Sequence, residues 1–213
     1  MKKDKKLNFN RTVIISGGEI TNYEYIKQLI KKTDYIICAD SGYDHALKMD
    51  ITPDLVVGDF DSSITMPPEN IKITFPPKKN LTDTEISLNI AREYGFNNFL
   101  LLACLGSRLD HTLANIFLLK SSIKHNETMC IANEYNKIFI TNSKIELNIM
   151  KGQLVSLLPL ENCTGKTTYN LEYPLNNADL PMGTTIGISN VAIKENICIS
   201  VNSGHLLIIL AND

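Results

Sequence analysis

The sequence contains no tryptophan and almost no net charge: 21 basic and 23 acidic residues in a chain of 213 give a formal charge of -2. A balanced chain with a pI near 6.1 lacks the basic surface that recognises nucleic acid or an anionic membrane. No apolar run approaches the ~20 residues that cross a bilayer. We therefore expect a globular protein with neither a nucleic-acid partner nor a membrane partner.

Cysteines are few, and their spacing suggests no site. The five cysteines include no C-x-x-C pair and are odd in number, which argues against a disulfide framework and a zinc site, so we expect buried free thiols. The lysine-rich start, residues 2–6, is followed by no apolar run and does not have the form of a secretory signal. These features predict a cytoplasmic protein.

Common nucleotide and nucleophile motifs are also missing. There is no G-x-G-x-x-G fingerprint, and the run Gly165–Thr167 lacks the first glycine of a Walker-type P-loop. No G-x-S-x-G motif and no Cys–His pairing can be argued. The sequence gives no indication of a dinucleotide cofactor or of acyl transfer through a serine or cysteine.

The first part of the chain alternates strand-like apolar runs with helical segments. Two helix starts have the form of a capping box, Thr21 with Glu24 and Thr82 with Glu85. This alternation predicts a doubly wound, mostly parallel sheet flanked by helices. The strand-like runs are residues 13–16, 35–39, 55–57, 71–75, 99–105 and 129–132.

From about Lys137 the pattern changes to short strand-like runs separated by Asn, Gly and Pro, which indicates an all-β domain. We place the boundary near residues 141–143, with an α/β domain over 1–141 and a smaller C-terminal all-β domain over 142–213. The runs are residues 137–141, 145–149, 154–158, 166–171, 185–193, 197–201 and 206–210.

Acidic residues collect where the predicted strands end. Asp59 and Asp61 follow the run 55–57 directly, and residues two apart in an extended segment lie on the same side, ~6–7 Å apart. Two such carboxylates can hold Mg²⁺, with waters completing the octahedron. A solvated acidic turn is the alternative, but the carboxyl end of a parallel strand is where doubly wound folds bind ligands.

Two further strand-to-helix turns carry candidates. Asp83 could hold a metal or complement the dipole of the helix it begins. Arg108 could bind phosphate through its planar fork while Asp110 faces a metal, or the two could form a structural ion pair. Asn115 could line the same cleft, and Lys79 adds a cation near Asp83. Together these residues suit Mg²⁺–polyphosphate chemistry better than proton abstraction or acyl transfer.

At these residues the sequence resembles the thiamin pyrophosphokinase family. The matching segments run in the family's order from about residue 13 to the end, and GDFDS, TDT and RLDH together are specific, although each alone is weak. The segments are Ala39–Gly42, Pro53–Ser62, Thr82–Glu85, Gly106–His111 with Asn115, Leu171–Leu175, Gly187–Asn190 and Gly204.

The resemblance implies a fold, a reaction and an assembly. The family has an α/β catalytic domain, a C-terminal β-sandwich domain, and a homodimeric assembly with active sites at the interface. Its members transfer a pyrophosphoryl group from ATP to the hydroxyl of thiamine, giving AMP and thiamine diphosphate, with Mg²⁺ as cofactor. The expected partners are therefore thiamine, ATP as co-substrate, and a second copy of the chain.

The resemblance also implies roles for individual residues. The metal ligands would be Asp59, Asp61 and Asp83, which with Arg108 and Asp110 form the catalytic set. The ATP and phosphate contacts would be Asp40, Ser41, Lys79, Thr82, Arg108, His111 and Asn115. The thiamine contacts would be Tyr173, Ser189 and Asn190, the last two supplied by the partner subunit.

The sequence departs from the family pattern in two places. Val191 stands where many bacterial members have Glu, and there is no tryptophan to stack on the thiazolium. Two other functions stay open: a related pyrophosphokinase with another hydroxyalkyl acceptor, such as a pterin, and a non-catalytic thiamine or nucleotide sensor. The run Tyr173–Leu175 with Ser189 and Asn190 favours thiamine, and the intact set of carboxylates argues against a sensor.

Overall fold

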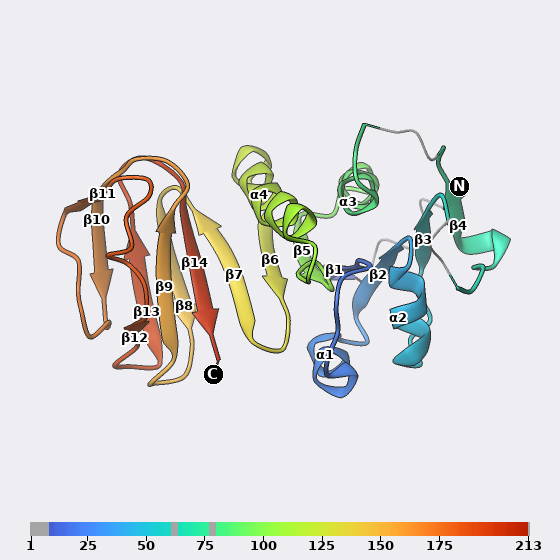
Figure 1. Ribbon diagram of the computed structural model, residues 1–213, viewed down its shortest axis with the longest axis horizontal. Coiled ribbons are helices and arrows are strands. Elements are labelled where there is room, and N and C mark those ends of the chain that lie inside the picture. The colour runs from blue at the N-terminus through green and yellow to red at the C-terminus, as the bar shows by residue number, and fades with distance from the viewer. Residues whose placement is uncertain (1–8, 61–63, 77–79, 213) are drawn as a thin grey trace. The chain divides into compact units, whose positions relative to one another are not determined.

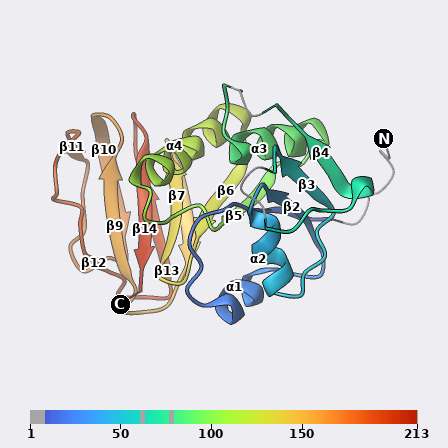
Figure 2. The same ribbon diagram turned by 45° about the vertical axis from the view of Figure 1, so that its right-hand side comes forward.

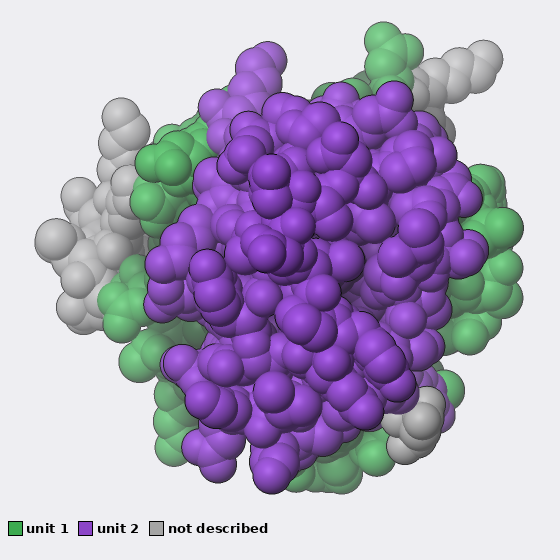
Figure 3. Space-filling view, turned by 90° about the vertical axis from the view of Figure 1, so that its left-hand side faces the viewer, with its two compact units in different colours: residues 1–118, 125–134 green, residues 119–124, 135–213 purple. Residues whose placement is uncertain are grey.

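A computed structural model describes residues 9–60, 64–76 and 80–212 of the chain (Figure 1). The chain divides into two compact units (Figure 3). Unit 1 comprises residues 1–118 and 125–134, and unit 2 comprises residues 119–124 and 135–213. Residues 136–141, which the sequence pattern assigned to the first domain, lie in unit 2.

Unit 1 is built on parallel strands in the order β6-β5-β1-β2-β3-β4. The predicted doubly wound sheet is thereby confirmed. Its central strands are apolar on both faces, and Val13, Ile14 and Ile15 are fully buried. The strands are β1 (Arg11–Ile15), β2 (Asp34–Ala39), β3 (Leu55–Gly58), β4 (Lys72–Thr74), β5 (Asn98–Leu102) and β6 (Thr128–Ala132).

Helices cover both faces of this sheet, with α1 and α2 on one side and α3 and α4 on the other (Figure 2). None of the helices in the described part of the chain has the length and apolar character to cross a membrane. The helices are α1 (Tyr23–Leu29), α2 (Gly42–Lys48), α3 (Asp83–Glu93) and α4 (Leu109–His125), with a 3-10 turn, η2 (Glu69–Ile71).

Of the two predicted capping boxes, that of α3 is confirmed: the Thr82 hydroxyl accepts from the Glu85 N–H at 3.2 Å. The prediction for α1 was wrong, because its N-cap is Asn22, whose side chain accepts from the Tyr25 N–H at 3.0 Å. The Glu134 carboxylate accepts from the N–H groups of Thr21 and Asn22, both at 2.7 Å, and so holds the start of the helix from outside.

The order of the strands creates a switch point at β1. The chain proceeds from β1 to β2, β3 and β4 on one side, and then crosses to β5 and β6 on the other side. The connections that leave β1 and β5 therefore diverge to opposite faces of the sheet. In doubly wound folds the crevice at such a point, outside the carboxyl ends of the strands, is where ligands bind.

Apart from residues 119–124, which belong to α4, the described part of unit 2 is all-β, as predicted. Its strands form two antiparallel runs of hydrogen-bonded neighbours, in the orders β12-β9-β14-β7 and β11-β10-β13-β8. One apolar core takes side chains from both runs, such as Leu157 and Ile208 from the first and Ile197 and Ile199 from the second. The strands are β7 (Asn136–Thr141), β8 (Lys144–Asn148), β9 (Leu154–Pro159), β10 (Cys163–Tyr169), β11 (Ala178–Leu180), β12 (Asn190–Val191), β13 (Asn196–Ser200) and β14 (Leu206–Ala211).

The prediction of one strand over residues 185–193 was wrong, because a turn precedes the short strand β12. Ser189 has a left-handed φ of +56°, which ends the extended conformation. Gly187 lies so close to β9 that an added Cβ would be 2.3 Å from the Leu157 carbonyl oxygen. The five cysteines are free, as expected; Cys38, Cys104 and Cys163 are buried and the other two are half-buried.

Candidate active site

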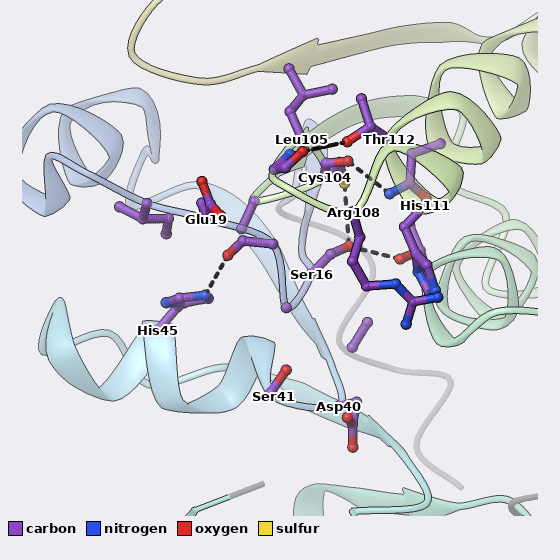
Figure 4. Close-up of a pocket in the computed structure, with 18 of the residues that line it drawn as sticks. Ser16, Glu19, Asp40, Ser41, His45, Cys104, Leu105, Arg108, His111 and Thr112 are labelled. Atoms are coloured by element: carbon purple, nitrogen blue, oxygen red, sulfur yellow. Dashed lines mark hydrogen bonds between the residues drawn. The ribbon is translucent and has the colours of Figure 1, made fainter. Parts of the chain in front are cut away.

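A cavity of about 750 Å³ lies at the switch point of unit 1, outside the carboxyl ends of β1, β2 and β5 (Figure 4). Its walls come from the segments that follow these three strands, from the first turn of α3 and from the start of α4. The position and size are those of a small-molecule site in a doubly wound fold. The lining segments are residues 16–21, 39–41, 82–84 and 103–108, with His45, His111, Thr112 and Asn115.

Glycines allow these segments to approach one another. A Cβ at Gly42, in the first turn of α2, would lie 2.0 Å from the Ile15 carbonyl oxygen. A Cβ at Gly18, in the turn after β1, would lie 2.4 Å from the Ala103 carbonyl oxygen. Any larger residue at either position would push apart the strand ends that form the cavity.

Two of the acidic candidates, Asp40 and Asp83, line the cavity, whereas Asp59 is not among the lining residues. Asp40 has a left-handed φ of +49°, and its carboxylate accepts from the Phe60 N–H at 3.2 Å. Burial raises the pKa of Asp40, and the negative charges of Asp83 and Asp59 raise it further. Asp40 is therefore close enough to Asp83 and to Asp59 for each of their charges to act on it. Asp61 lies outside the described residues.

The donor set at this position is hard and anionic. In the described part of the chain, no group of three or more His, Cys, Asp or Glu side chains is arranged to hold a metal ion by itself. The carboxylates of Asp40 and Asp83, which line the cavity, are oxygen donors of the kind that Mg²⁺ prefers together with substrate phosphates and waters.

Arg108 and Asp110 form an ion pair at the cavity. The Arg108 guanidinium donates to both carboxylate oxygens of Asp110, at 2.6 and 3.3 Å, and both side chains are exposed. This hydrogen bonding lowers the pKa of Asp110 to about 2, so its carboxylate is ionised at neutral pH. Arg108 lines the cavity. The two alternatives raised from the sequence, an ion pair and a phosphate contact, are therefore compatible.

The other predicted phosphate contacts differ in what their side chains do. Ser41 and His111 line the cavity, whereas the Thr82 hydroxyl is engaged as the N-cap of α3. Asn115 is buried, and its amide donates to the Cys104 carbonyl at 2.8 Å, which fixes the loop after β5. The structure thus brings these four residues to one cavity, while Lys79 lies outside the described residues.

Sequence reasoning missed part of this wall. Ser16 follows β1, and its hydroxyl forms hydrogen bonds with the Thr84 hydroxyl at 2.8 Å and with the Cys104 thiol at 3.2 Å. These two bonds connect three segments of the cavity wall. The Glu19 carboxylate accepts from the Ser107 N–H at 3.2 Å. The adjacent glycines directly after the first predicted strand were the available signal, because such a turn lets the chain pass close to a ligand or to another backbone.

The residues predicted to contact the second substrate lie together in unit 2. Tyr173 and Ser189 are exposed, and the Ser189 N–H donates to the Ser156 hydroxyl at 3.1 Å. Asn190 is buried, and its amide donates to the Tyr173 carbonyl at 2.7 Å. Its side-chain oxygen accepts from the N–H groups of Tyr173 at 3.0 Å and Val191 at 2.9 Å. Asn190 therefore holds the backbone that presents Tyr173.

Comparison with known proteins places both units in one family. Residues 26–131 match "Thiamin pyrophosphokinase, catalytic domain", and residues 136–206 match "Thiamin pyrophosphokinase, vitamin B1 binding domain". The thiamine pyrophosphokinase of Bacillus subtilis is 29% identical over 187 residues, 83% of this chain and 87% of that protein.

Solved structures give the same result. The crystal structure of the Bacillus subtilis thiamine pyrophosphokinase has a TM-score of 0.86 and 26% identity, and the alignment covers 95% of this chain and 99% of that one. The thiamin pyrophosphokinase of Geobacillus thermodenitrificans has a TM-score of 0.82 at 25% identity, with coverage of 95% and 98%. The chain is an enzyme that belongs to the thiamin pyrophosphokinase family.

Proposed function

We propose that this protein transfers the pyrophosphoryl group of ATP to the hydroxyl of thiamine. The hydroxyl oxygen attacks the β-phosphorus, a new O–P bond forms, and the bond between the β-phosphorus and the bridging oxygen of the α-phosphate breaks. AMP leaves with that oxygen, the hydroxyl proton passes to solvent, and thiamine diphosphate is the second product. The observation that carries the proposal is the cavity at the switch point, which combines Asp40, Asp83 and Arg108.

We infer that Asp59, Asp61 and Asp83 hold the Mg²⁺ of the ATP complex. The ion would neutralise charge on the β- and γ-phosphates during transfer. Beyond the effect of burial, the charges of Asp83 and Asp59 raise the pKa of Asp40, which supports this assignment, because a bound cation would offset that repulsion.

The protein's own part is to position the two reactants. The ion pair with Asp110 already orients the Arg108 side chain. When a phosphate binds to the remaining N–H groups, little further side-chain entropy is therefore lost. Ser41 and His111 supply polar contacts along the cavity wall. Such placement accounts for most of the barrier reduction in phosphoryl transfer, which needs no strong base.

We further propose that thiamine binds against Tyr173 and Ser189 of unit 2, and that the enzyme is a cytoplasmic homodimer whose sites combine unit 1 of one chain with unit 2 of its partner. The exposure of both side chains and the firm anchoring of their backbone by Asn190 support the thiamine assignment. The free cysteines agree with a reducing compartment.

An AMP-release assay tests the proposed function. AMP should appear only when ATP, Mg²⁺ and thiamine are all present, with thiamine diphosphate formed in equal amount. Release with a hydroxymethyl pterin in place of thiamine would favour the related pyrophosphokinase. Binding of ATP or thiamine with no release of AMP under any of these conditions would favour a sensor.

Replacing Arg108 with Lys should raise the KM for ATP about tenfold or more, because hydrogen bonds to charged groups contribute ~1.5–3 kcal/mol. Lysine keeps the positive charge but loses the planar fork that can hold Asp110 and a phosphate together. Steady-state kinetics with varied ATP measures the effect. Unchanged ATP kinetics would show that Arg108 forms only a structural ion pair with Asp110 and does not bind phosphate.

Replacing Asn190 with Ala should destabilise unit 2 by about 2 kcal/mol, because it leaves three backbone groups without their partner. Urea unfolding measures this. Ser189→Ala is the matched control: its exposed hydroxyl contributes little to folding, so this variant should keep its stability and raise the KM for thiamine. Equal stability of both variants would show that Asn190 does not hold the Tyr173 segment.

A further inference from the structure

His45 joins two walls of the cavity and was not singled out by the sequence. It lies in α2, is half-buried and lines the cavity. Its Nε2 is 2.8 Å from the Gly18 carbonyl oxygen (Figure 4). Its Nδ1 is 2.8 Å from the Tyr23 hydroxyl. Because a carbonyl only accepts hydrogen bonds, Nε2 carries the proton and donates to Gly18.

The state of the imidazole follows from these partners. With the proton on Nε2, a neutral ring leaves Nδ1 as an acceptor for the Tyr23 hydroxyl. Burial lowers the pKa of His45, and the nearby Lys48 charge acts in the same direction, while the Gly18 bond and Asp44 oppose it. The ring is therefore neutral at pH 7, with one nitrogen donating to the turn and the other held by α1.

The turn that His45 holds is made of two adjacent glycines. On its other side this turn is fixed by the β5 segment: the N–H groups of Ser16, Gly18 and Glu19 donate to the carbonyls of Leu102, Ala103 and Leu105, at 2.9, 2.7 and 3.2 Å. A Cβ at Gly17 would lie 2.1 Å from the Ser41 hydroxyl, which would have to rotate away, whereas a Cβ at Gly18 would lie 2.4 Å from the Ala103 carbonyl oxygen. This close approach to backbone requires glycine at position 18, yet a pair of glycines gives a turn many conformations.

We propose that His45 is a positioning residue for the nucleotide: it fixes the Gly17–Gly18 turn from the α2 side and so keeps this wall of the cavity in the shape that binds ATP. The proposal rests on the proposed function, since it assigns the cavity to ATP. Without the imidazole, the glycine pair would be held only from the side of the β5 segment, and the rest of its ordering would fall to ATP. That cost would reduce ATP affinity rather than the rate of transfer from bound ATP.

The test compares three substitutions with the unaltered enzyme. His45→Ala removes both hydrogen bonds, His45→Gln places an amide N–H where Nε2–H lies, and Tyr23→Phe removes the hydroxyl that holds Nδ1. His125→Ala, at an exposed position at the end of α4, is the control. The readouts are kcat, the KM for ATP and for thiamine, and the Kd of Mg–ATP by calorimetry without thiamine.

We expect His45→Ala to raise both the KM and the Kd for ATP about tenfold, the equivalent of one or two neutral hydrogen bonds. The kcat and the KM for thiamine should stay within about twofold, since the catalytic carboxylates are untouched. His45→Gln should recover most of the affinity, Tyr23→Phe should have a smaller effect, and the control none. Unchanged ATP affinity in His45→Ala, or equal losses in all parameters without rescue by His45→Gln, would overturn the proposal.

A second readout is independent of activity. In the protein without ligands, amide hydrogen exchange of residues 16–19 should be faster in His45→Ala than in the unaltered chain, and slowed again in His45→Gln. Equal exchange in all three proteins would overturn the role of His45, whatever the enzyme assay gives. If the unaltered chain did not bind ATP, the proposed function would be contradicted instead. The exchange comparison would still decide whether His45 holds the turn.

Discussion

Asp83→Asn should lower kcat by about a hundredfold or more, the scale seen when one group that stabilises developing charge is removed. Asp83 lies in the first turn of α3 at the wall of the cavity, close enough for its charge to raise the pKa of Asp40. Asparagine has nearly the same shape and leaves the Thr82 cap in place, but it lacks the negative charge that Mg²⁺ binding requires.

The measurement is AMP release over a range of Mg²⁺ concentrations, with circular dichroism to show that the fold is kept. Asp50→Asn is the matched control, because Asp50 is an acidic residue whose side chain is 93% exposed and which lies away from the cavity lining. Asp59→Asn should behave as Asp83→Asn does. Normal turnover of either variant at limiting Mg²⁺ would remove that residue from the metal ligands.

The parallel sheet could be predicted because its signals are local. β1 and β5 contain the apolar runs Val13–Ile15 and Phe99–Leu102 because both faces of the sheet are covered, and the cap of α3 depends on residues three apart. The N-cap of α1 is equally local, since Asn22 bonds the Tyr25 N–H, and choosing Thr21 instead was an error of one position. The contacts of Glu134 with the N–H groups of Thr21 and Asn22 join residues more than a hundred positions apart, and no local pattern reports them.

The error in unit 2 has a similar origin. Residues 185–193 have the apolar and β-branched composition of a strand, but their backbone follows β9, where Gly187 accepts from the Leu157 N–H at 2.8 Å and Ser189 turns left-handed. Composition reports which side chains suit a sheet. It does not report where a neighbouring backbone forces a turn.

The candidate site shows the same division. Asp83 and Arg108 could be grouped from the sequence, because the carboxyl ends of parallel strands share one edge, whereas Asp40 was indicated only by the family resemblance. His45 could not be grouped with them, since its two partners belong to other elements and no spacing connects them. For Asn190 the family resemblance implied a thiamine contact, and the structure shows its amide bonded to backbone groups of Tyr173 and Val191.

Mixing two inactive variants should restore activity if each site combines two chains. The cavity with Asp83 is lined by residues of unit 1, whereas Tyr173 and Ser189 lie in unit 2. One chain would carry Asp83→Asn, and the other Tyr173→Ala with Ser189→Ala. The last two side chains are exposed, so their loss should not unfold unit 2.

A mixed dimer with shared sites would pair the intact unit 1 of one chain with the intact unit 2 of the other. It would therefore hold one working site and one site that carries all three substitutions. Random exchange makes half of the dimers mixed, so activity should rise from near zero to about a quarter of the unaltered value. Two affinity tags, purified in succession, verify that mixed dimers form. If such dimers stay inactive, each site is built from a single chain, because only then does every site in the mixture retain one of the two defects.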